Sequence, residues 1–565
     1  MKFAIIVIVI ILIAMVIKAK YDEYLYRLRV KTEWEYRFGN PPEEEYNDER
    51  FQAVSRYHVL THEGDGVDDI TWNDLGMDDI YGVMNQTCCA AGEEFLYHLL
   101  RTPLFDQEKL EERSKLTRLF QENENLRIQL QIILSRMGKL YKISLYEYMH
   151  KLDDIKIENF WARLFYPLSL VAGVISCLFI PSVGIILLLI FMGNNMFQYF
   201  KRKAAIDPYI RVMVLVRRMI GCMEELSSTE VENHGEAEEI LSGYISQTKE
   251  LAKTFSSFVR GSWMLALGKN MGGNLWDSLL DYVRMLFHID LLQFNKMAAQ
   301  IKKHNRELEQ MFCIAGYLDS MISVSSYQAM FGDMLCKPEF VSSEKKCFHS
   351  EQIYHPRIVE PVKNSIYADS CVLLTGANAS GKSTFLKTVA LNAILAQTIH
   401  TVHAGSYKAP FYRIYSSMAL RDDLAGNDSY YMVEIKSLKR ILDASKEEKV
   451  PVLCFVDEVL RGTNTLERIA ASSCILQEMS TMNLLCFAAT HDGELCSLLS
   501  DCYANYHFEE QITKDEVTFD YKLKEGQAMS RNAIRLLVMS GYDKKITDKA
   551  EKAANTFLSK GVWEI

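Results

Sequence analysis

Residues 373–384 read Leu-Leu-Thr-Gly-Ala-Asn-Ala-Ser-Gly-Lys-Ser-Thr, and this stretch decides the fold of the C-terminal part of the chain. Gly376 and Gly381 bracket four residues, and the pair Lys-Ser follows at once, which is the spacing of a phosphate-binding loop. Glycines let backbone N–H groups turn towards phosphates, the lysine reaches the β and γ phosphates, and the serine hydroxyl ligates Mg²⁺. The candidate nucleotide-binding residues are Gly376, Asn378, Ser380, Gly381, Lys382, Ser383 and Thr384, with Ser383 also a metal ligand.

The sequence on either side of this loop supports the same interpretation. An apolar strand is predicted over residues 371–374, directly ahead of the loop, and a helix over residues 385–397, directly behind it. The positive N-terminal end of such a helix would face the phosphates. A glycine-rich surface loop is the alternative, but it requires neither the strand nor the helix.

Two more apolar stretches end in polar residues that suit phosphoryl transfer. Residues 452–456 read as a buried parallel strand and are followed by Asp457 and Glu458. We assign Asp457 to the Mg²⁺ shell and Glu458 to the attacking water. Residues 484–489 form another apolar strand, and His491 lies just beyond its end, where it can sense the γ phosphate. A purely structural histidine is the alternative.

Composition bounds the class of protein. The chain has 565 residues, enough for about three or four domains. Hydrophobic residues make up 49%, charged residues 24%, and the formal net charge is −10, which excludes a disordered chain and a strongly basic nucleic-acid binder. The 13 cysteines show no Cys-x-x-Cys pair and no paired Cys/His metal spacing, so we expect reduced, buried thiols in a cytosolic setting.

The N-terminus carries an uncharged, branched aliphatic stretch over residues 3–17. No small-residue cleavage site follows, which argues against the alternative of a signal peptide. Lys18, Lys20 and Arg27 stand on its C-terminal side, and positive charge marks the cytoplasmic flank of a membrane span. We therefore predict an uncleaved anchor whose C-terminal side, with the rest of the chain, faces the cytoplasm.

A second apolar region covers residues 164–200. Two uncharged blocks, 164–180 and 183–192, are parted only by Pro181-Ser182, and neither block has a polar face. Positive residues stand on both flanks, which places both ends of a hairpin in the cytoplasm. A buried helical hairpin of a soluble core is the alternative. We predict a membrane hairpin, and hence a multi-pass protein of the cell membrane.

The rest of the chain before the loop is helical in pattern. Residues 79–100 and 110–137 carry apolar residues at helical spacing, and residues 21–69 read as a polar, acidic linker or a solvated helix face. Within residues 286–331, Met297, Ile301, Leu308 and Phe312 share one face, which predicts long paired helices. Whether the opposite, basic face contacts DNA stays open.

Together with the resemblance that these motifs carry to a known family, the sequence implies an α/β phosphate-loop ATPase domain of the ABC type at the C-terminus, preceded by an all-α core and lever domain with transmembrane helices. The domain limits that follow are 1–20 for the anchor, 21–69 for the linker, 70–335 for the helical domain interrupted by the hairpin at 164–200, and 336–565 for the ATPase domain.

These motifs carry a resemblance to the MutS-type DNA mismatch repair ATPases. Residues 375–384 resemble that family's phosphate loop, with alanine at 377 where the family usually has proline. Residues 428–434, Asp-Ser-Tyr-Tyr-Met-Val-Glu, resemble its Ser-Thr-Phe-Met-x-Glu signature, with Ser429 in the serine position. Residues 457–465 are similar to its Asp-Glu-x-x-Arg-Gly-Thr stretch, although Glu-Arg replaces the usual Asp-Gly that follows. The resemblance is strong over residues 350–550 and weaker over 70–335.

The resemblance implies an ATPase that uses ATP and Mg²⁺ in a head-to-tail homodimer, with Ser429 of each copy facing the partner's γ phosphate. It also implies double-stranded DNA as a partner, clamped by helical levers. The family's mismatch-reading domain is expected to be missing, because only an anchor and a short linker precede the helical core. The alternative is an ATP-driven switch that acts on a protein or membrane partner without binding DNA. A transporter of the ABC class fits less well, since the sequence has no Leu-Ser-Gly-Gly-Gln signature.

Overall fold

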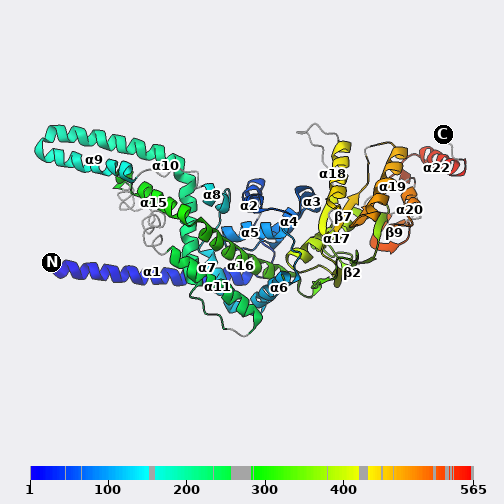
Figure 1. The fold of residues 1–565 in the computed structure, drawn as a ribbon, viewed down its shortest axis with the longest axis horizontal. Helices are drawn as coiled ribbons and strands as arrows, with labels where there is room; N and C mark the ends of the chain where they lie inside the picture. Colours follow the sequence, from blue (N-terminus) through cyan, green and yellow to red (C-terminus); the bar gives the residue numbers. More distant parts are fainter. Residues whose placement is uncertain are drawn as a thin grey trace. The chain divides into compact units, whose positions relative to one another are not determined.

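A computed structural model describes the chain outside a set of short segments and one longer one. The segments outside the description are residues 1, 45, 65, 152–159, 233–234, 256–281, 284, 378–379, 419–429, 447–448, 462, 513–516, 528–533, 535–536, 539 and 561–565. Contacts group the chain into two compact units (Figure 1). The first comprises Met1–Glu63, Tyr81–Leu99 and Glu112–Met330, and the second Gly64–Ile80, Leu100–Glu111 and Phe331–Ile565. The domain limits drawn from the sequence stay predictions.

The second unit contains a six-stranded sheet in the order β10-β9-β4-β8-β7-β6. All neighbouring strands run parallel except β10, which pairs antiparallel with β9. The strands are β4 (Cys371–Thr375), β6 (Arg413–Ser417), β7 (Val452–Asp457), β8 (Leu484–Ala489), β9 (Tyr503–Ile512) and β10 (Val517–Glu525). The strands predicted at 371–374, 452–456 and 484–489 are confirmed, since fully buried parallel strands are apolar on both faces.

Helices lie against this sheet and bury its apolar side chains. They are α17 (Lys382–Thr398), α18 (Tyr430–Ala444), α19 (Thr465–Thr481) and α20 (Gly493–Leu498), with α22 (Lys544–Lys560) further along the chain. The helix predicted at 385–397 falls within α17. Asn464 caps α19 by accepting a hydrogen bond from the Glu467 N–H at 3.0 Å, which satisfies one free donor of the first turn. Strands β4, β7 and β8 therefore form the centre of a closed core.

A smaller sheet in the same unit has the order β1-β5-β2-β3. Its strands are β1 (Glu339–Phe340), β2 (Phe348–Ile353), β3 (Asn364–Ala368) and β5 (Ser406–Ala409). The unit also takes in α3 (Asp69–Leu75), which packs on β6. There Thr71 Oγ1 accepts from the Ser416 N–H at 3.0 Å, and Asp74 Oδ2 accepts from the Ser416 hydroxyl at 2.7 Å. A segment far back in the sequence thus completes the edge of the large sheet.

The described part of the first unit contains helices joined by turns and loops, and no strand. Its helices, with those that run into it, are α1 (Lys2–Arg37), α2 (Asp48–Thr61), α4 (Met77–Met84), α5 (Ala90–Arg101), α6 (Gln107–Glu122), α7 (Glu124–Ser135), α8 (Leu145–Lys151), α9 (Phe160–Phe179), α10 (Pro181–Leu226), α11 (Glu236–Thr254), α15 (Ile289–Lys303) and α16 (Asn305–Phe331). The four apolar residues that predicted paired helices, Met297, Ile301, Leu308 and Phe312, are all buried in α15 and α16.

A buried carboxylate ties α16 to the start of α5. Asp319 accepts hydrogen bonds from the backbone N–H groups of Cys88 at 2.9 Å and Cys89 at 3.0 Å. Gly92 permits this approach, because a Cβ there would lie 2.0 Å from Asp319 Oδ2. All 13 cysteines of the chain are free thiols, and eight of them are buried, but Cys474 is exposed and the other four are half-buried, so the prediction of buried thiols holds only in part.

Residues 21–69 are largely helical. The second half of α1 and all of α2 lie in this stretch, and each buries one face, with Trp34 and Tyr57 both buried. The sequence predicts either a polar linker or a solvated helix face for this stretch. The structure has helices, because aromatic residues recur on one side of an otherwise charged pattern.

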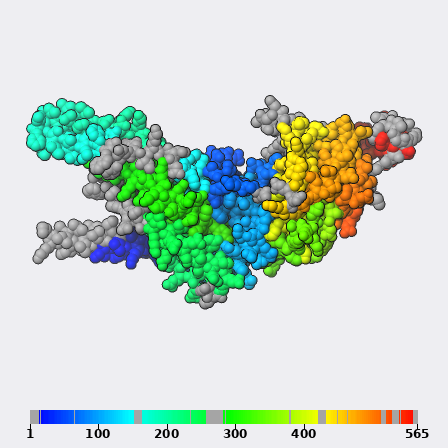
Figure 2. Space-filling model, viewed as in Figure 1, coloured from blue at the N-terminus to red at the C-terminus, as the bar shows by residue number. Residues whose placement is uncertain are grey.

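The hairpin at 164–200 is formed by α9 and α10, which lie side by side and antiparallel (Figure 1). In the space-filling view the hairpin forms one continuous lobe (Figure 2). A Cβ on Gly184 would lie 2.3 Å from the backbone nitrogen of Cys177, so the tight tip needs glycine. Large apolar residues are exposed along it, namely Val174, Ile175, Leu178, Phe179, Ile180, Val183, Ile185, Ile186, Leu189 and Ile190. The second half of α10 is instead buried within the unit.

Among the described residues, one helical stretch, Pro181–Asp207, is long and apolar enough to cross a membrane, and Leu164–Phe179 is apolar but shorter. The sequence predicted three spans. Residues 2–17 lie in α1, but the side chains of residues 1–12 lie outside the description. The membrane segments at 1–20 and 164–200 therefore stay predictions.

Candidate active site

The carboxyl ends of β4, β7 and β8 meet at one edge of the large sheet. Strand register places Leu374 of β4 beside Ala489 of β8, and Ala489 in turn beside Asp457 of β7. The loop after β4, the acidic pair after β7 and the turn after β8 therefore emerge at one level. In open parallel sheets this edge is where ligands bind.

The two glycines of the loop have backbone conformations that other residues avoid. Gly376 has φ 144°, and a Cβ there would lie 2.7 Å from the carbonyl oxygen of Phe508. Gly381 has φ 108° and stands at the N-cap of α17. Between them, the Ser380 hydroxyl is buried and has no hydrogen-bond partner among the described residues. The loop thus holds a polar donor that a ligand oxygen would satisfy.

Lys382 is the first residue of α17 and is only 5% exposed. Its Nζ donates to the carbonyl oxygens of Gly376 at 2.8 Å and Ala377 at 2.9 Å, and it lies 3.4 Å from His491 Nε2. Burial lowers the pKa of Lys382, while the nearby charges of Asp457 and Glu458 act in the opposite direction. The ammonium group therefore lies inside the loop and is held beside the acidic pair.

Ser383 and Asp457 bring two oxygen ligands together. Ser383 Oγ donates to Asp457 Oδ2 at 2.5 Å. Burial raises the pKa of Asp457, and the charge of Glu458 raises it further, whereas the hydrogen bond from Ser383 lowers it. A carboxylate that is costly to keep charged in isolation is stabilised by a bound cation.

Glu458 and His491 form the next contact at this edge. His491 Nε2 lies 2.9 Å from Glu458 Oε1, and Arg461 Nη1 lies 2.8 Å from Glu458 Oε2. Glu458 has φ 54°, a backbone angle that is uncommon for a residue other than glycine. Residues with such angles cluster at functional sites. The carboxylate is thereby turned towards the histidine at the end of the neighbouring strand.

Two positioning residues had no role assigned from the sequence, although Glu434 ends the signature-like stretch 428–434. Arg468 of α19 makes a two-pronged ion pair with Asp492, at 2.9 Å from Nε and 2.7 Å from Nη2, and so fixes the turn that bears His491. Glu434 of α18 is 3% exposed and accepts a hydrogen bond from the Leu460 N–H, two residues after Glu458. The departure from the usual Asp-Gly at 467–468 was the one sequence signal that pointed to Arg468.

The structure brings together most of the residues predicted for the site. Gly376, Ser380, Gly381, Lys382, Ser383, Asp457, Glu458 and His491 all lie at the edge described above. Thr384 is exposed on the first turn of α17. Asn378 and Ser429 lie outside the described residues. The roles given to all these residues stay predictions.

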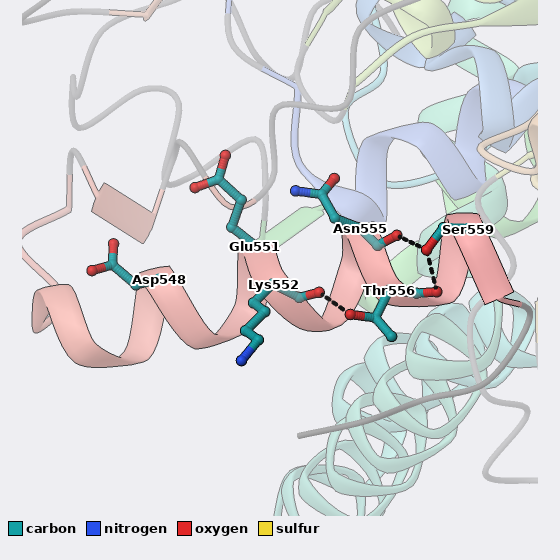
Figure 3. Close-up of a pocket in the computed structure, with 6 residues that line it drawn as sticks. All are labelled: Asp548, Glu551, Lys552, Asn555, Thr556 and Ser559. Atoms are coloured by element: carbon teal, nitrogen blue, oxygen red, sulfur yellow. Dashed lines mark hydrogen bonds between the residues drawn. The ribbon is translucent and has the colours of Figure 1, made fainter.

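A hollow elsewhere in the second unit does not compete with this site (Figure 3). Its lining comes from one face of α22, namely Asp548, Glu551, Lys552, Asn555, Thr556 and Ser559. The Thr556 hydroxyl donates to the Lys552 carbonyl oxygen at 2.8 Å, and the Ser559 hydroxyl donates to that of Asn555 at 3.0 Å. Both hydroxyls donate to carbonyl oxygens of their own helix, so neither is free to bind a ligand in the hollow.

The donor set fits a nucleoside triphosphate with Mg²⁺. The unsatisfied Ser380 hydroxyl, the Lys382 ammonium and the N-terminus of α17 suit phosphate oxygens, and Ser383 with Asp457 suits a hard cation. Fold and site together define a phosphate-loop α/β domain of the nucleoside-triphosphate-binding class.

Comparison with known proteins refines this class. Residues 372–558 match the family described as MutS domain V. The chain is 28% identical over 286 residues to the DNA mismatch repair protein MutS of Staphylococcus epidermidis, covering 48% of this chain and 32% of that protein. It is 29% identical over 273 residues to the MutS protein homolog 4 of Mus musculus, covering 44% and 27%. With MutS of Thermus thermophilus it shares 32% identity over 184 residues, covering 32% and 22%.

The chain thus spans about a third or less of the length of these curated relatives. The matched segment is similar to MutS domain V, which agrees with the resemblance drawn from the sequence. It contains the loop, both acidic residues and the histidine of the site.

Proposed function

We propose that this chain is a membrane-anchored, MutS-related ATPase that binds and hydrolyses ATP in a head-to-tail homodimer. The ATP state would be coupled to clamping of double-stranded DNA by the helical levers. The observation that carries the proposal is the meeting of the Lys382 ammonium, the Ser383–Asp457 pair and the Glu458–His491 pair at one sheet edge. Each of these groups has a separate task in phosphoryl transfer.

The binding task falls to the loop. Lys382 supplies a buried cation to the β and γ phosphates, and the N-terminus of α17 adds its partial positive charge. Ser383 and Asp457 would hold Mg²⁺, which when bound neutralises charge on the phosphate oxygens. These residues thereby orient the triphosphate and shield its charge.

The chemical task falls to Glu458 and His491. Glu458 accepts a proton from the attacking water, and its contact with His491 at 2.9 Å fixes the direction of the carboxylate. When ATP is bound, His491 would sense the γ phosphate by a hydrogen bond. Arg468 holds the turn that carries His491, so it acts as a positioning residue.

The negative charge of the bound triphosphate favours a dimer. One lysine and one divalent cation leave part of the triphosphate charge unneutralised, and a second donor surface from another copy completes the shell. We assign this role to Ser429, which directly precedes α18 in the sequence. Glu434 on the same helix bonds to the turn after Glu458, which links the two regions within one copy.

The proposal has two alternative partners, DNA on the one hand and a protein or membrane on the other. The name of these relatives, DNA mismatch repair protein MutS, favours DNA. The net charge of −10 and the exposed apolar hairpin favour the alternative, an ATP-driven switch on a protein or membrane partner. That the chain lacks a mismatch-reading domain stays a prediction.

The membrane part of the proposal rests on α1, α9 and α10. Apolar side chains stay exposed along the hairpin, and Lys201, Arg202 and Lys203 follow it, which favours a cytoplasmic ATPase domain in a multi-pass protein of the cell membrane. Compartment reporters fused at residues 1 and 565 should report opposite sides of the membrane. Both reporters in the cytoplasm would overturn the anchor.

The experiment for the function uses the full chain purified in detergent. It should hydrolyse ATP only with Mg²⁺, and DNA affinity should fall steeply as salt rises, because phosphate contacts release counterions. A folded protein without hydrolysis would refute the ATPase. Hydrolysis without salt-dependent DNA binding would rule out DNA clamping and favour the alternative, an ATP-driven switch that acts on a protein or membrane partner.

A further inference from the structure

Three side chains that the nucleotide site does not use meet on the smaller sheet of the second unit. Strand β2 pairs with β3 in the register Phe348↔Ala368 and His349↔Tyr367. Continuing this register by one residue sets Cys347 opposite Asp369. Residues two apart on a strand share a face, so Cys347 and His349 point the same way. The hairpin register alone therefore gathers a thiol, an imidazole and a carboxylate.

The ligand atoms of these residues are close together. One ligand atom from each of Cys347, His349 and Asp369 lies within 4.8 Å of the other two. His349 Nε2 lies 2.8 Å from Asp369 Oδ1. Exposure is graded, since Cys347 is 6% exposed, His349 is half-buried and Asp369 is exposed. A cation thus has a path from solvent to the thiol.

We propose that Cys347, His349 and Asp369 form a binding site for a divalent transition-metal cation of the Zn²⁺ class. Sulfur, nitrogen and oxygen ligands together suit Zn²⁺, whereas Mg²⁺ and Ca²⁺ prefer oxygen alone. Three protein ligands leave a fourth position for water or an anion. Bonds of about 2.0–2.3 Å in a tetrahedron separate ligand atoms by about 3.5 Å, so the exposed Asp369 side chain must rotate slightly outward.

Charge around the site permits a cation. The thiolate and the carboxylate together balance a divalent ion. The adjoining hollow, of about 530 Å³, is also lined by Lys345, Lys346 and Lys408. Lys408 is paired with Glu339 at 2.5 Å, and the Lys346 ammonium donates to the Met482 carbonyl oxygen at 2.8 Å. Lys345 is exposed, so solvent screens its charge.

A nucleophilic role for the same residues fits less well. Burial raises the pKa of Cys347 and the charge of Asp369 raises it further, while the charges of Lys345 and Lys408 act in the opposite direction. A thiol in that state is a poor nucleophile, because the thiolate is the reactive form. Binding of a metal removes this difficulty, since the cation itself stabilises the thiolate. The site is separate from the loop, so it stands or falls independently of the proposed ATPase.

The test uses Co²⁺ as a spectroscopic probe on the full chain in detergent, stripped with a chelator and kept reduced. We expect one equivalent of Co²⁺ to give a thiolate-to-cobalt charge-transfer band that Zn²⁺ abolishes. Cys347→Ser should lose the band. Asp369→Asn should weaken Co²⁺ binding by at least about tenfold, since even outer-shell losses cost that much. The matched control is Cys474→Ser, which changes an exposed cysteine on α19 and should keep the band.

The proposal is overturned if the wild-type chain gives no band at one equivalent, or if Cys347→Ser keeps it. Circular dichroism checks that each variant is folded. If Cys347→Ser does not fold, Asp369→Asn decides, because the Asp369 side chain is exposed and its replacement leaves the core intact. An unchanged Co²⁺ affinity in that variant overturns the site.

Discussion

Ser383 Oγ and Asp457 Oδ2 lie 2.5 Å apart, although 74 residues separate them in the sequence. The contact joins the first turn of α17 to the end of β7, which lies two strands away from β4 in the sheet. Two hard oxygen ligands at this distance can share one Mg²⁺. The pairing therefore defines the proposed metal position without reference to any other residue.

The first prediction concerns this pair. Ser383→Ala should slow Mg²⁺-dependent ATP hydrolysis by at least about tenfold, because one ligand of the cation is lost. Ser383→Thr keeps the hydroxyl and serves as the control. Hydrolysis rates measured across a Mg²⁺ titration separate the two variants. An alanine variant with the wild-type Mg²⁺ dependence would place the cation elsewhere.

Lys382 should decide nucleotide affinity. Lys382→Ala removes the buried cation of the loop, and we expect ATP binding to weaken by about tenfold to a hundredfold, the worth of charge-assisted hydrogen bonds. Titration with a fluorescent ATP analogue measures this change. Lys387→Ala, on the same helix but outside the loop, is the matched control. Equal losses in both variants would point to damage of α17 and not to the site.

Glu434 should affect catalysis and not binding. Glu434→Ala leaves the buried Leu460 N–H without its acceptor, at a cost of about 1–3 kcal/mol, and loosens the turn after Glu458. We expect kcat to fall while KM for ATP stays near its wild-type value. Glu434→Gln retains a carbonyl acceptor and should recover part of the rate. A rise in KM with unchanged kcat would contradict a positioning role.

Glu94 should make the stability of the helical unit depend on pH. Burial raises its pKa to about 8, from 4.5 in the unfolded chain, while hydrogen bonds from the Ser144 hydroxyl and the Leu145 N–H act against this. The folded state therefore holds a proton that the unfolded state releases between these values. The stabilisation is fully present below about pH 4.5 and is lost as pH rises through about 8.

Glu94→Gln stays neutral at every pH, so its Tm relative to wild type should rise between about pH 5 and about pH 9. Thermal unfolding of both proteins at several pH values measures the difference. Glu108→Gln, at an exposed position on α6, should show no such trend. A constant difference between Glu94→Gln and wild type would show that Glu94 carries its charge in the folded state.

Much of the C-terminal α/β unit could be predicted from the sequence because its signals are local. Uninterrupted apolar runs predicted β4, β7 and β8, and the carboxyl ends of parallel strands necessarily meet at one edge. Glycine spacing predicted the loop, and the structure gives Gly376 and Gly381 backbone angles that favour glycine.

The features that could not be predicted depend on register and long-range packing. Cys347 and Asp369 meet only because β2 and β3 pair in one particular register. Arg468 of α19 pairs with Asp492 in the turn after β8, and Glu434 bonds to the N–H of Leu460, 26 residues later. The packing of α3 on β6 joins segments separated by more than 300 residues. No spacing rule in a single sequence encodes such contacts.

The measurement that tests the central claim most directly is the molecular mass of the detergent-solubilised chain with ATP and Mg²⁺. Glu458→Gln should still bind ATP but hydrolyse it at least about 10² times more slowly, since the proton acceptor is lost. It should therefore accumulate as an ATP-bound dimer. Glu467→Gln, an exposed change on α19, should turn over and dissociate normally. Sedimentation of both variants with and without ATP gives the answer. A Glu458→Gln protein that stays monomeric with ATP, while the wild-type monomer hydrolyses ATP at its full rate, would contradict the account.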